Sequence, residues 1–458
     1  MSARALVVAG LAGGSGKSVV AVGLAAAWRE AGRTVATFKK GPDYIDAGWL
    51  ARAAGRPCYN LDPYLSPVEE LRRGFYSHCP PDGLVVLEGN RGLFDGVDAA
   101  GGYSTAELAC QLDLPVLLVV NCSKTTRTVA ALVMGCQVFD PRVRLVGVVL
   151  NQIANARHEA VIRASLALRG LPPVLGVVRR RRRDIFPMRH LGITPHQESE
   201  GAERTLAELA ALAREGFDLA AIEAAMAELP AAGPQAVAPT VTTAPVRIGI
   251  LRDAAFQFYY EENLEALRGA GAELVEINAL TAAALPPDLD GLYIGGGFPE
   301  TSADLLAENE GFRISVRNAA QDGLPIYAEC GGLIFLGRAI VLEGREYPLA
   351  GVFPITFGLG KKPQAHGYSQ FRVEGANPFY PVGSVIRGHE FRYSTVDAWD
   401  GQPEELTLAM ERGTGFQGGR DGLVFGNVLA LYTHVLASGT PAWASGLVAA
   451  ARRRKSSR

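Results

Sequence analysis

The chain has 458 residues, of which 48% are hydrophobic and 20% charged, so it can bury a large core and is not disordered as a whole. Its 45 Lys and Arg residues balance 47 Asp and Glu residues, and a net charge of −2 argues against a general binder of nucleic acid or membrane surfaces. The 6 cysteines include no CxxC pair and no Cys/His cluster at zinc spacing, which argues against a disulfide scaffold and favours a reducing cytoplasm.

The N-terminus, MSARALVVAGLAGGSGK, contains an apolar stretch that runs directly into a glycine-rich loop. No small-residue cleavage pattern follows it, so we predict no signal peptide. The sequence also contains no apolar run of the roughly 18 residues that a membrane-spanning helix needs. We therefore expect a cytoplasmic protein that does not enter a membrane.

Both halves of the chain alternate short Val- and Leu-rich segments with Ala-rich amphipathic segments. This alternation is typical of parallel strands that are buried on both faces and joined by helices. A Pro- and Ala-rich stretch without charge, residues 229–245, separates the halves and predicts an interdomain linker. We expect two doubly wound α/β domains, residues 1–228 and 246–458, with more β-structure beyond Gly351.

The first predicted strand, ALVVAG, leads into a variant of the Walker A phosphate loop and then into a helix that ends near Gly32. Backbone N–H groups of such a loop surround phosphates, its lysine reaches the β- and γ-phosphates, and its hydroxyl binds Mg²⁺. The sequence is similar to the deviant Walker A ATPases, although Ala12 replaces the second lysine of the partitioning members. The candidate ATP-binding residues are Gly13, Gly14, Gly16, Lys17 and Ser18.

Four acidic residues follow predicted strands in the same half. Asp43 and Asp46 lie in the segment KKGPDYID, Glu88 ends the strand LVVLE, and Asp95 lies in the loop GNRGLFDG. The carboxyl ends of parallel strands meet at one edge of a sheet, where ligands bind in this fold. We expect these carboxylates to coordinate Mg²⁺ and to handle a substrate.

In the second half, a strand leads into Cys330 on a turn flanked by glycine, as in a nucleophile elbow. A preceding strand ends in a run of three glycines, of which Gly296 and Gly297 are candidates for an oxyanion hole. His434 is the candidate base. The order of these residues resembles class I glutamine amidotransferases, but Leu436 occupies the position where most members carry the triad glutamate. We expect the other cysteines to be structural: Cys58, Cys79, Cys110, Cys122 and Cys136.

Together these motifs resemble the cobyrinic acid a,c-diamide synthase family over nearly the whole chain. The resemblance includes GPDYID, LEG with GLFDG, RHLGITP, DGLYIGGGFPE, YAECGGL, GHEFRYS and YTH. It implies that the first domain uses MgATP to phosphorylate a tetrapyrrole carboxylate. It also implies that Cys330 and His434 release ammonia from glutamine, that the ammonia converts the acyl phosphate to an amide, and that the protein is a homodimer. By this resemblance Ser18, Asp43 and Glu88 hold the metal, and Asp46 and Asp95 act on the substrate.

The acidic loop departs from the pattern EGVMGL(Y/F)DG of corrin-specific members, because Asn90 and Arg91 replace Val and Met. Arg91 is therefore a candidate for pairing with a substrate acetate. Cobyrinate is the expected substrate, and sirohydrochlorin, its nickel form and sirohaem remain alternatives. Two other classes remain open: a partitioning or regulatory ATPase, against which Ala12 and the glutaminase-like half argue, and a binding protein without chemistry, against which Lys17, Cys330 and His434 argue.

Overall fold

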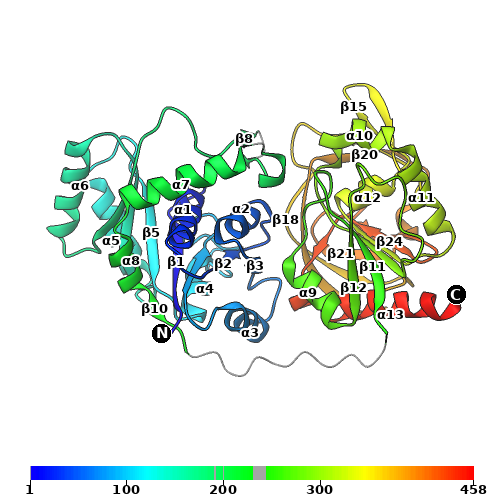
Figure 1. The fold of residues 1–458 in the computed structure, drawn as a ribbon, viewed down its shortest axis with the longest axis horizontal. Coiled ribbons are helices and arrows are strands. Elements are labelled where there is room, and N and C mark those ends of the chain that lie inside the picture. Colours follow the sequence, from blue (N-terminus) through cyan, green and yellow to red (C-terminus); the bar gives the residue numbers. More distant parts are fainter. Residues whose placement is uncertain (1, 190–191, 200, 231–243) are drawn as a thin grey trace. The chain divides into compact units, whose positions relative to one another are not determined.

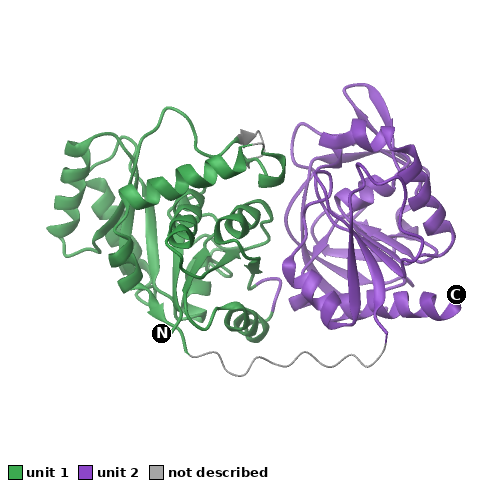
Figure 2. Cartoon of the chain, in the orientation of Figure 1, with its two compact units in different colours: residues 1–63, 67–236 green, residues 64–66, 237–458 purple. Residues whose placement is uncertain are grey.

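The computed structural model describes residues 2–189, 192–199, 201–230 and 244–458. These residues separate into two compact units, which Figure 1 and Figure 2 draw in the same orientation. Unit 1 comprises Met1–Pro63 and Pro67–Ala236, and unit 2 comprises Tyr64–Ser66 and Val237–Arg458. Most of the linker predicted at 229–245 lies outside the described residues.

Unit 1 is built on a sheet of buried, Val- and Leu-rich strands in the order β3-β2-β4-β1-β5-β6-β7. All neighbours along this path are parallel, and a short strand pairs antiparallel with the start of β1. The strands are β1 Arg4–Gly10, β2 Val35–Lys40, β3 Cys58–Leu61, β4 Leu84–Glu88, β5 Val116–Asn121, β6 Leu145–Ile153, β7 Val174–Arg179 and β10 Ala227–Glu228. A separate pair consists of β8 Met188–Arg189 and β9 Gly192–Ile193.

Helices cover both faces of this sheet, because successive residues of each strand point to opposite sides. Leu6 and Val8 pack in one apolar cluster, and Val7 and Ala9 pack in the other. The first face is covered by α1 Lys17–Glu30, α2 Ile45–Ala54, α7 Ala202–Gly216 and α8 Leu219–Ala225. The second is covered by α3 Val68–His78, α4 Thr105–Gln111, α5 Thr128–Phe139 and α6 Ala156–Ala167. A 3₁₀ turn, η1 His196–Glu198, precedes α7.

Unit 2 contains a second sheet, in the order β12-β11-β13-β14-β24-β23, that is parallel except for β23. Its strands are β11 Val246–Leu251, β12 Ala272–Ile277, β13 Gly291–Ile294, β14 Ile326–Glu329, β23 Leu423–Phe425 and β24 Val428–Leu431. Helices α9 Glu261–Gly269 and α13 Ala442–Ser457 pack on one face. The other face contacts α10 Ala303–Glu308, α11 Glu310–Gln321 and α12 Gly331–Leu336.

Two smaller sheets account for the β-rich pattern beyond Gly351. One consists of β16 Arg345–Pro348, β15 Ala339–Leu342, β17 Ile355–Leu359 and β20 Ser394–Trp399. The other consists of β22 Arg420–Asp421, β21 Leu408–Arg412, β18 Ala365–Val373, β19 Val385–Arg392 and β25 His434–Val435. Short 3₁₀ turns are η2 Pro299–Ser302, η3 Pro403–Glu405 and η4 Ala437–Gly439. The predicted fold class, two α/β units on parallel sheets, is confirmed.

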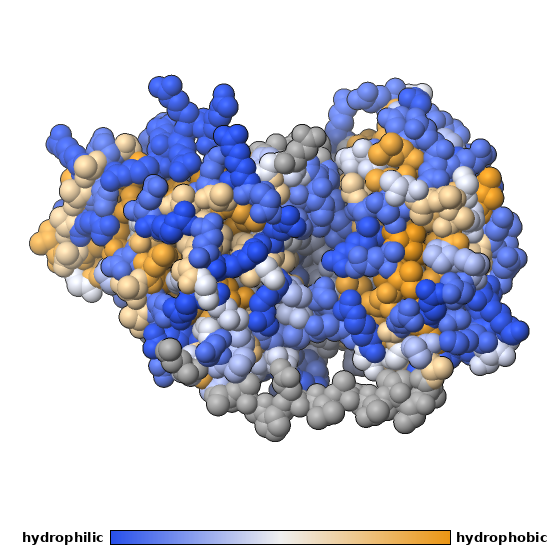
Figure 3. All heavy atoms as spheres, in the orientation of Figure 1, coloured by the Kyte–Doolittle hydropathy of each residue, from blue (hydrophilic) through white to orange (hydrophobic). Residues whose placement is uncertain are grey.

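No helix within the described ranges is long and apolar enough to cross a membrane. The face drawn in Figure 3 mixes hydrophilic and hydrophobic side chains in both units. The basic run that begins at Arg179 is exposed, and Arg179 and Arg181 form ion pairs with Glu159 and Glu208. These residues therefore form a solvated surface segment with local ion pairs.

Candidate active sites

The predicted phosphate loop lies between the end of β1 and the start of α1. Gly16 has a φ of 97°, and a Cβ added to it would stand 2.3 Å from Nδ2 of Asn151. The same Asn151 amide donates to the backbone oxygen of Ser15 at 2.9 Å, so the end of β6 fixes the loop and requires glycine there. A Cβ added to Gly13 or Gly14 would meet nothing within 4 Å, so this part of the loop leaves its backbone accessible to a ligand.

Behind the loop, a buried lysine joins two carboxylates. Lys39 is the next-to-last residue of β2, and 1% of its side chain is exposed. Its Nζ donates to Asp46 Oδ2 at 2.6 Å and to Glu88 Oε1 at 3.1 Å. The Ser18 hydroxyl donates to the same Glu88 oxygen at 2.8 Å and to Asp46 Oδ1 at 3.3 Å. The first turn of α1 and the ends of two strands therefore meet in one hydrogen-bonded cluster.

Burial and the neighbouring charges both shift the pKa values of the residues in this cluster. Burial, and then the neighbouring Asp46 carboxylate, raise the pKa of Glu88 to about 7 and that of Asp43 to about 6. Burial also opposes the charge of Lys39, but Asp46 and Glu88 hold its pKa above the ordinary value. Burial and the charge of Lys39 lower the pKa of Lys17, whose Nζ donates to the backbone oxygen of Ala12 at 3.0 Å.

The residues that meet here fit a magnesium ion. Ser18, Asp46 and Glu88 bring hydroxyl and carboxylate oxygens together, which are the donors that Mg²⁺ prefers. Glu88 Oε2 is buried and has no hydrogen-bond partner among the described residues. Asp43 instead accepts a hydrogen bond from the backbone N–H of Asp46 at 2.8 Å. Within the described part of the chain, no group of three or more His, Cys, Asp and Glu side chains could hold a metal by itself.

The acidic loop packs against the start of the phosphate loop. The backbone N–H of Leu93 donates to the Gly10 oxygen at 2.7 Å, and Asp95 Oδ2 accepts from the Gly92 N–H at 2.9 Å. The charge of Asp95 acts on Lys17, which places it near the phosphate site. Arg91 is exposed, and its φ of 50° is unusual for a residue with a side chain.

In unit 2, Cys330 lies on a sharp turn between β14 and α12. Its φ of 47° and ψ of −98° are the strained geometry expected of a nucleophile elbow. Its N–H donates to the Leu431 oxygen at 2.8 Å, which ties the turn to the end of β24. A Cβ added to Gly331 would stand 3.0 Å from the backbone nitrogen of Gly297, so the predicted oxyanion loop lies beside the elbow.

The imidazole of His434 is buried, with 2% of its side chain exposed, and Cys330 lies close enough to act on its charge. A Cβ added to Gly296 would stand 2.4 Å from its Cε1, so glycine there leaves room for the ring. Burial by itself would lower the pKa of His434, but Cys330 and Glu329 raise it to about 10. The structure thus brings Cys330, His434, Gly296 and Gly297 together.

A buried polar network holds the segment that precedes His434. Asp421 is fully buried and accepts hydrogen bonds from the backbone N–H groups of Tyr432 and Thr433, at 3.0 and 3.4 Å. Burial, and then the nearby Glu390, raise the pKa of Asp421 to about 7. The guanidinium of Arg392 stacks on the Tyr432 ring with 3.9 Å between its Cζ and the ring centroid. This packing fixes the backbone from which the His434 ring projects.

Two residues of these sites are absent from the sequence-based candidates. Lys39 occurs in the motif KKGPDYID. Its place near the end of a predicted strand, close to Asp43 and Asp46, could have indicated that it belongs to the site. Glu329 directly precedes Cys330, and its position beside the predicted nucleophile was the corresponding signal.

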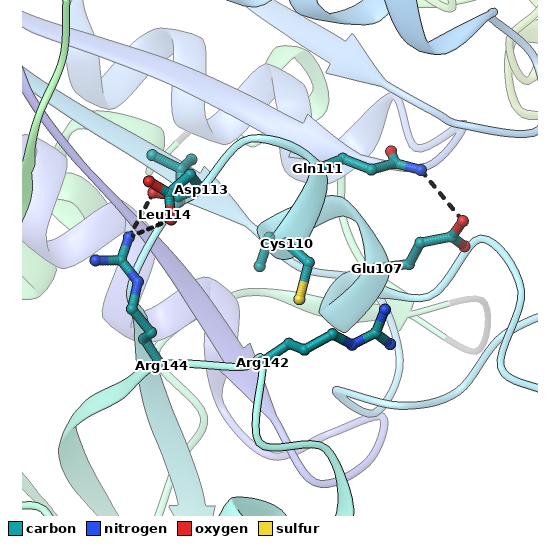
Figure 4. Close-up of a pocket in the computed structure, with 8 residues that line it drawn as sticks. Glu107, Cys110, Gln111, Asp113, Leu114, Arg142 and Arg144 are labelled. Carbon is teal, nitrogen blue, oxygen red and sulfur yellow. Dashed lines mark hydrogen bonds and ion pairs between the residues drawn. The ribbon is translucent and has the colours of Figure 1, made fainter.

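The pocket in Figure 4 is lined by none of the residues of these two sites. It has a volume of about 450 Å³ and is lined by α4 and the segments around it. Arg144 forms an ion pair with Asp113 at 3.0 Å, and Arg142 forms one with Asp140 at 2.7 Å. Because its arginines are already paired, this pocket offers no unpaired cation to an anionic ligand.

Comparisons with known proteins agree with this division into two sites. Residues 6–191 match the CobQ/CobB/MinD/ParA nucleotide binding domain, and residues 247–442 match the CobB/CobQ-like glutamine amidotransferase domain. The chain is 40% identical to the cobyrinate a,c-diamide synthase of Magnetococcus marinus, over 94% of this chain and 93% of that protein. It is 40% identical to that of Syntrophotalea carbinolica, over 88% of each. A solved glutamine amidotransferase is 22% identical with a TM-score of 0.34, over 45% of this chain and 98% of its own.

The contact between Cys330 and His434 predicts that Cys330 is the most reactive thiol at neutral pH. The positive charge that His434 carries below its raised pKa of about 10 lies beside Cys330, whereas burial raises the pKa of Cys79 and Cys122 to about 12. Cys79 is 9% exposed and Cys330 only 5%, so exposure alone predicts the opposite order. We expect iodoacetamide at pH 7 to label Cys330 at least about ten times faster than Cys79 or Cys122, measured by peptide mass spectrometry.

The control for this experiment is His434→Gln, which should slow labelling of Cys330 and leave that of Cys79 unchanged. Equal labelling of the three cysteines in the parent protein would contradict the assignment of Cys330 as the activated thiol.

The cluster around Lys39 predicts that Lys39→Met weakens nucleotide binding. Without the ammonium, the buried Glu88 and the half-buried Asp46 lose the cation that both contact beside the phosphate loop. We expect the Kd of a non-hydrolysable MgATP analogue to rise at least about tenfold, measured by calorimetry. Lys40→Met is the matched control, because burial lowers the pKa of Lys40 and it makes no ion pair among the described residues. An unchanged Kd in Lys39→Met would show that the cluster does not support this site.

Proposed function

Because the chain belongs to the family of the cobyrinate a,c-diamide synthases, we propose that it uses ATP and glutamine to convert carboxylates of a tetrapyrrole into carboxamides. The observation that carries this proposal is the presence of both chemistries in one chain. Unit 1 has a phosphate loop beside a cluster of carboxylates, and unit 2 has a cysteine elbow beside a buried histidine. Cobyrinate is the proposed substrate, on its a- and c-acetates, as the names of the relatives suggest.

In unit 2, His434 holds the proton that comes from the Cys330 thiol, and the sulfur attacks the side-chain amide carbon of glutamine. The N–H groups of Gly296 and Gly297 stabilise the oxyanion that forms. The C–N bond then breaks, and ammonia leaves with the proton that His434 returns. Water, deprotonated by His434, hydrolyses the thioester, which releases glutamate and restores the thiol.

In unit 1, the terminal phosphoryl group of ATP passes to a substrate carboxylate. This step is needed because a carboxylate is a poor acceptor of ammonia, whereas an acyl phosphate has a good leaving group. The loop N–H groups and Lys17 bind the phosphates and neutralise the charge that develops on them. Ser18, Asp46 and Glu88 would hold Mg²⁺, which supplies positive charge to the phosphates when bound. Ammonia then displaces phosphate and leaves the carboxamide.

The proposal keeps the roles that the family resemblance gives to Asp43, at the metal, and to Asp95, at the substrate. Asp46, which the resemblance gives to the substrate, is proposed at the metal instead, because it contacts Ser18 and shares Lys39 with Glu88. The proposal also includes a homodimer and a cytoplasmic location, which rest on the same resemblance. Sirohydrochlorin and sirohaem remain alternative acceptors because Asn90 and Arg91 replace the Val and Met of the corrin-specific members.

Incubation with MgATP, glutamine and either cobyrinate or sirohydrochlorin tests this function. We expect cobyrinate to gain two carboxamides, each seen by mass spectrometry as the replacement of OH by NH₂. Cys330→Ser should lose the reaction with glutamine, because it lacks the thiol, but keep the reaction with ammonium salts. Amidation of sirohydrochlorin alone would transfer the function to that substrate. Glutamine-dependent synthesis at the parent rate in Cys330→Ser would refute the role of this cysteine.

Arg91 is proposed to pair with an acetate of the tetrapyrrole. It is exposed on the loop that packs against the phosphate loop, and it forms no ion pair in the described ranges. We expect Arg91→Ala to raise the KM for the tetrapyrrole about tenfold and to leave the KM for ATP unchanged. Arg91→Lys, which keeps the charge, should recover part of the loss. An unchanged KM for every acceptor in Arg91→Ala would show the idea to be wrong.

A further inference from the structure

The His434 ring faces a buried carboxylate from the residue before the nucleophile. Nδ1 of His434 lies 3.8 Å from Oε2 of Glu329, and the two side chains are 2% and 0% exposed. Leu436 occupies the position where most class I amidotransferases carry a glutamate, so the sequence pattern leaves His434 without that partner. We propose that Glu329 is the positioning residue that orients His434 and balances its charge during glutamine hydrolysis.

This role requires a fixed carboxylate, and the structure holds Glu329 from two sides. Its Oε1 accepts from the backbone N–H of Val435 at 3.1 Å, and its Oε2 accepts from the Tyr293 hydroxyl at 3.1 Å. A buried carboxylate with only two neutral donors remains costly to desolvate. The charge of an adjacent imidazolium offsets that cost, so this site favours the state of His434 that forms when the cysteine gives up its proton.

The separation of 3.8 Å suits an ion pair, and such contacts often tighten once substrate binds. With Nδ1 directed at Glu329, Nε2 remains for proton exchange with the Cys330 thiol. A carboxylate beside one imidazole nitrogen selects the tautomer and orientation in which the other nitrogen can act as a base. Glu329 thus supplies from the elbow strand what a triad carboxylate supplies elsewhere.

The other titratable groups around His434 do not balance the positive charge of its ring. Cys330 is the proton donor itself. His389 stacks on His434 with ring centroids 4.7 Å apart, but burial and the charge of His434 lower its pKa well below the ordinary value, so it is neutral. Its Nδ1 meets the Tyr260 hydroxyl at 3.2 Å. Among the described residues, Glu329 is the carboxylate in contact with the ring.

The test compares Glu329→Gln with Asp290→Asn in the full-length protein. Glu329→Gln removes the charge, and its amide oxygen can still accept from the Val435 N–H. Asp290 is a matched control because it is also buried, 4% exposed, and also accepts from a backbone N–H, that of Arg247 at 2.9 Å. Two quantities are measured: the titration midpoint of His434, by NMR of histidine-labelled protein assigned with His434→Gln, and the steady-state hydrolysis of glutamine.

We expect Glu329→Gln to lower the His434 midpoint by about one to three pH units. It should also lower kcat for glutamine at least about 100-fold with little change in KM, because the interaction acts on the ring rather than on bound glutamine. Synthesis supported by ammonium salts should remain at the parent rate. Glu329→Asp, which keeps the charge, should recover part of both losses, and Asp290→Asn should change neither.

A rate within about threefold of the parent in Glu329→Gln would overturn the proposal. So would a lost rate with an unchanged His434 midpoint, because that result assigns Glu329 a structural role alone. Equal effects of Asp290→Asn would also overturn it. The inference rests on the proposed glutaminase function, and the two fail differently: a parent protein that hydrolyses no glutamine refutes that function, whereas the His434 midpoint tests the contact with Glu329 directly.

Discussion

The ion pairs that Lys39 forms with Asp46 and Glu88 are the contact on which the first site depends. Their atoms come from the ends of two neighbouring strands and the first turn of α2, and Ser18 adds the first turn of α1. None of these charges is stable in a buried place alone, because water is removed from each. The ion pairs therefore fix the positions of β2, β4 and α2 relative to one another, because each element carries one of the charged residues.

Unit 2 also contains buried charged groups, and different residues stabilise them. Its sheet also ends in buried polar groups, and the Glu329 carboxylate lies 3.8 Å from the His434 ring. The two sites differ in what lies next to the charged groups. In unit 1 the cluster faces a loop whose glycines leave the backbone accessible, which suits a bound anion, whereas in unit 2 the glycine of the oxyanion loop makes room for the imidazole.

The sequence predicted the fold class because hydrophobic runs and glycine loops are local patterns. The same reasoning predicted the phosphate loop and the cysteine elbow, where strand, turn and helix are contiguous in the chain. It did not predict Lys39 or Glu329, because their importance depends on partners 49 and 105 residues away, which no local pattern reveals.

The pairing of β14 with β24 explains how a carboxylate before the nucleophile can replace one after the histidine. These strands are parallel, and Glu329 is opposite Leu431 in their register. His434 follows Leu431 by three residues, so the chain that leaves β24 turns back over the end of β14. The Glu329 carboxylate then meets both the Val435 N–H and the imidazole. Glu329 is carried to the imidazole by β14, the strand that also presents Cys330.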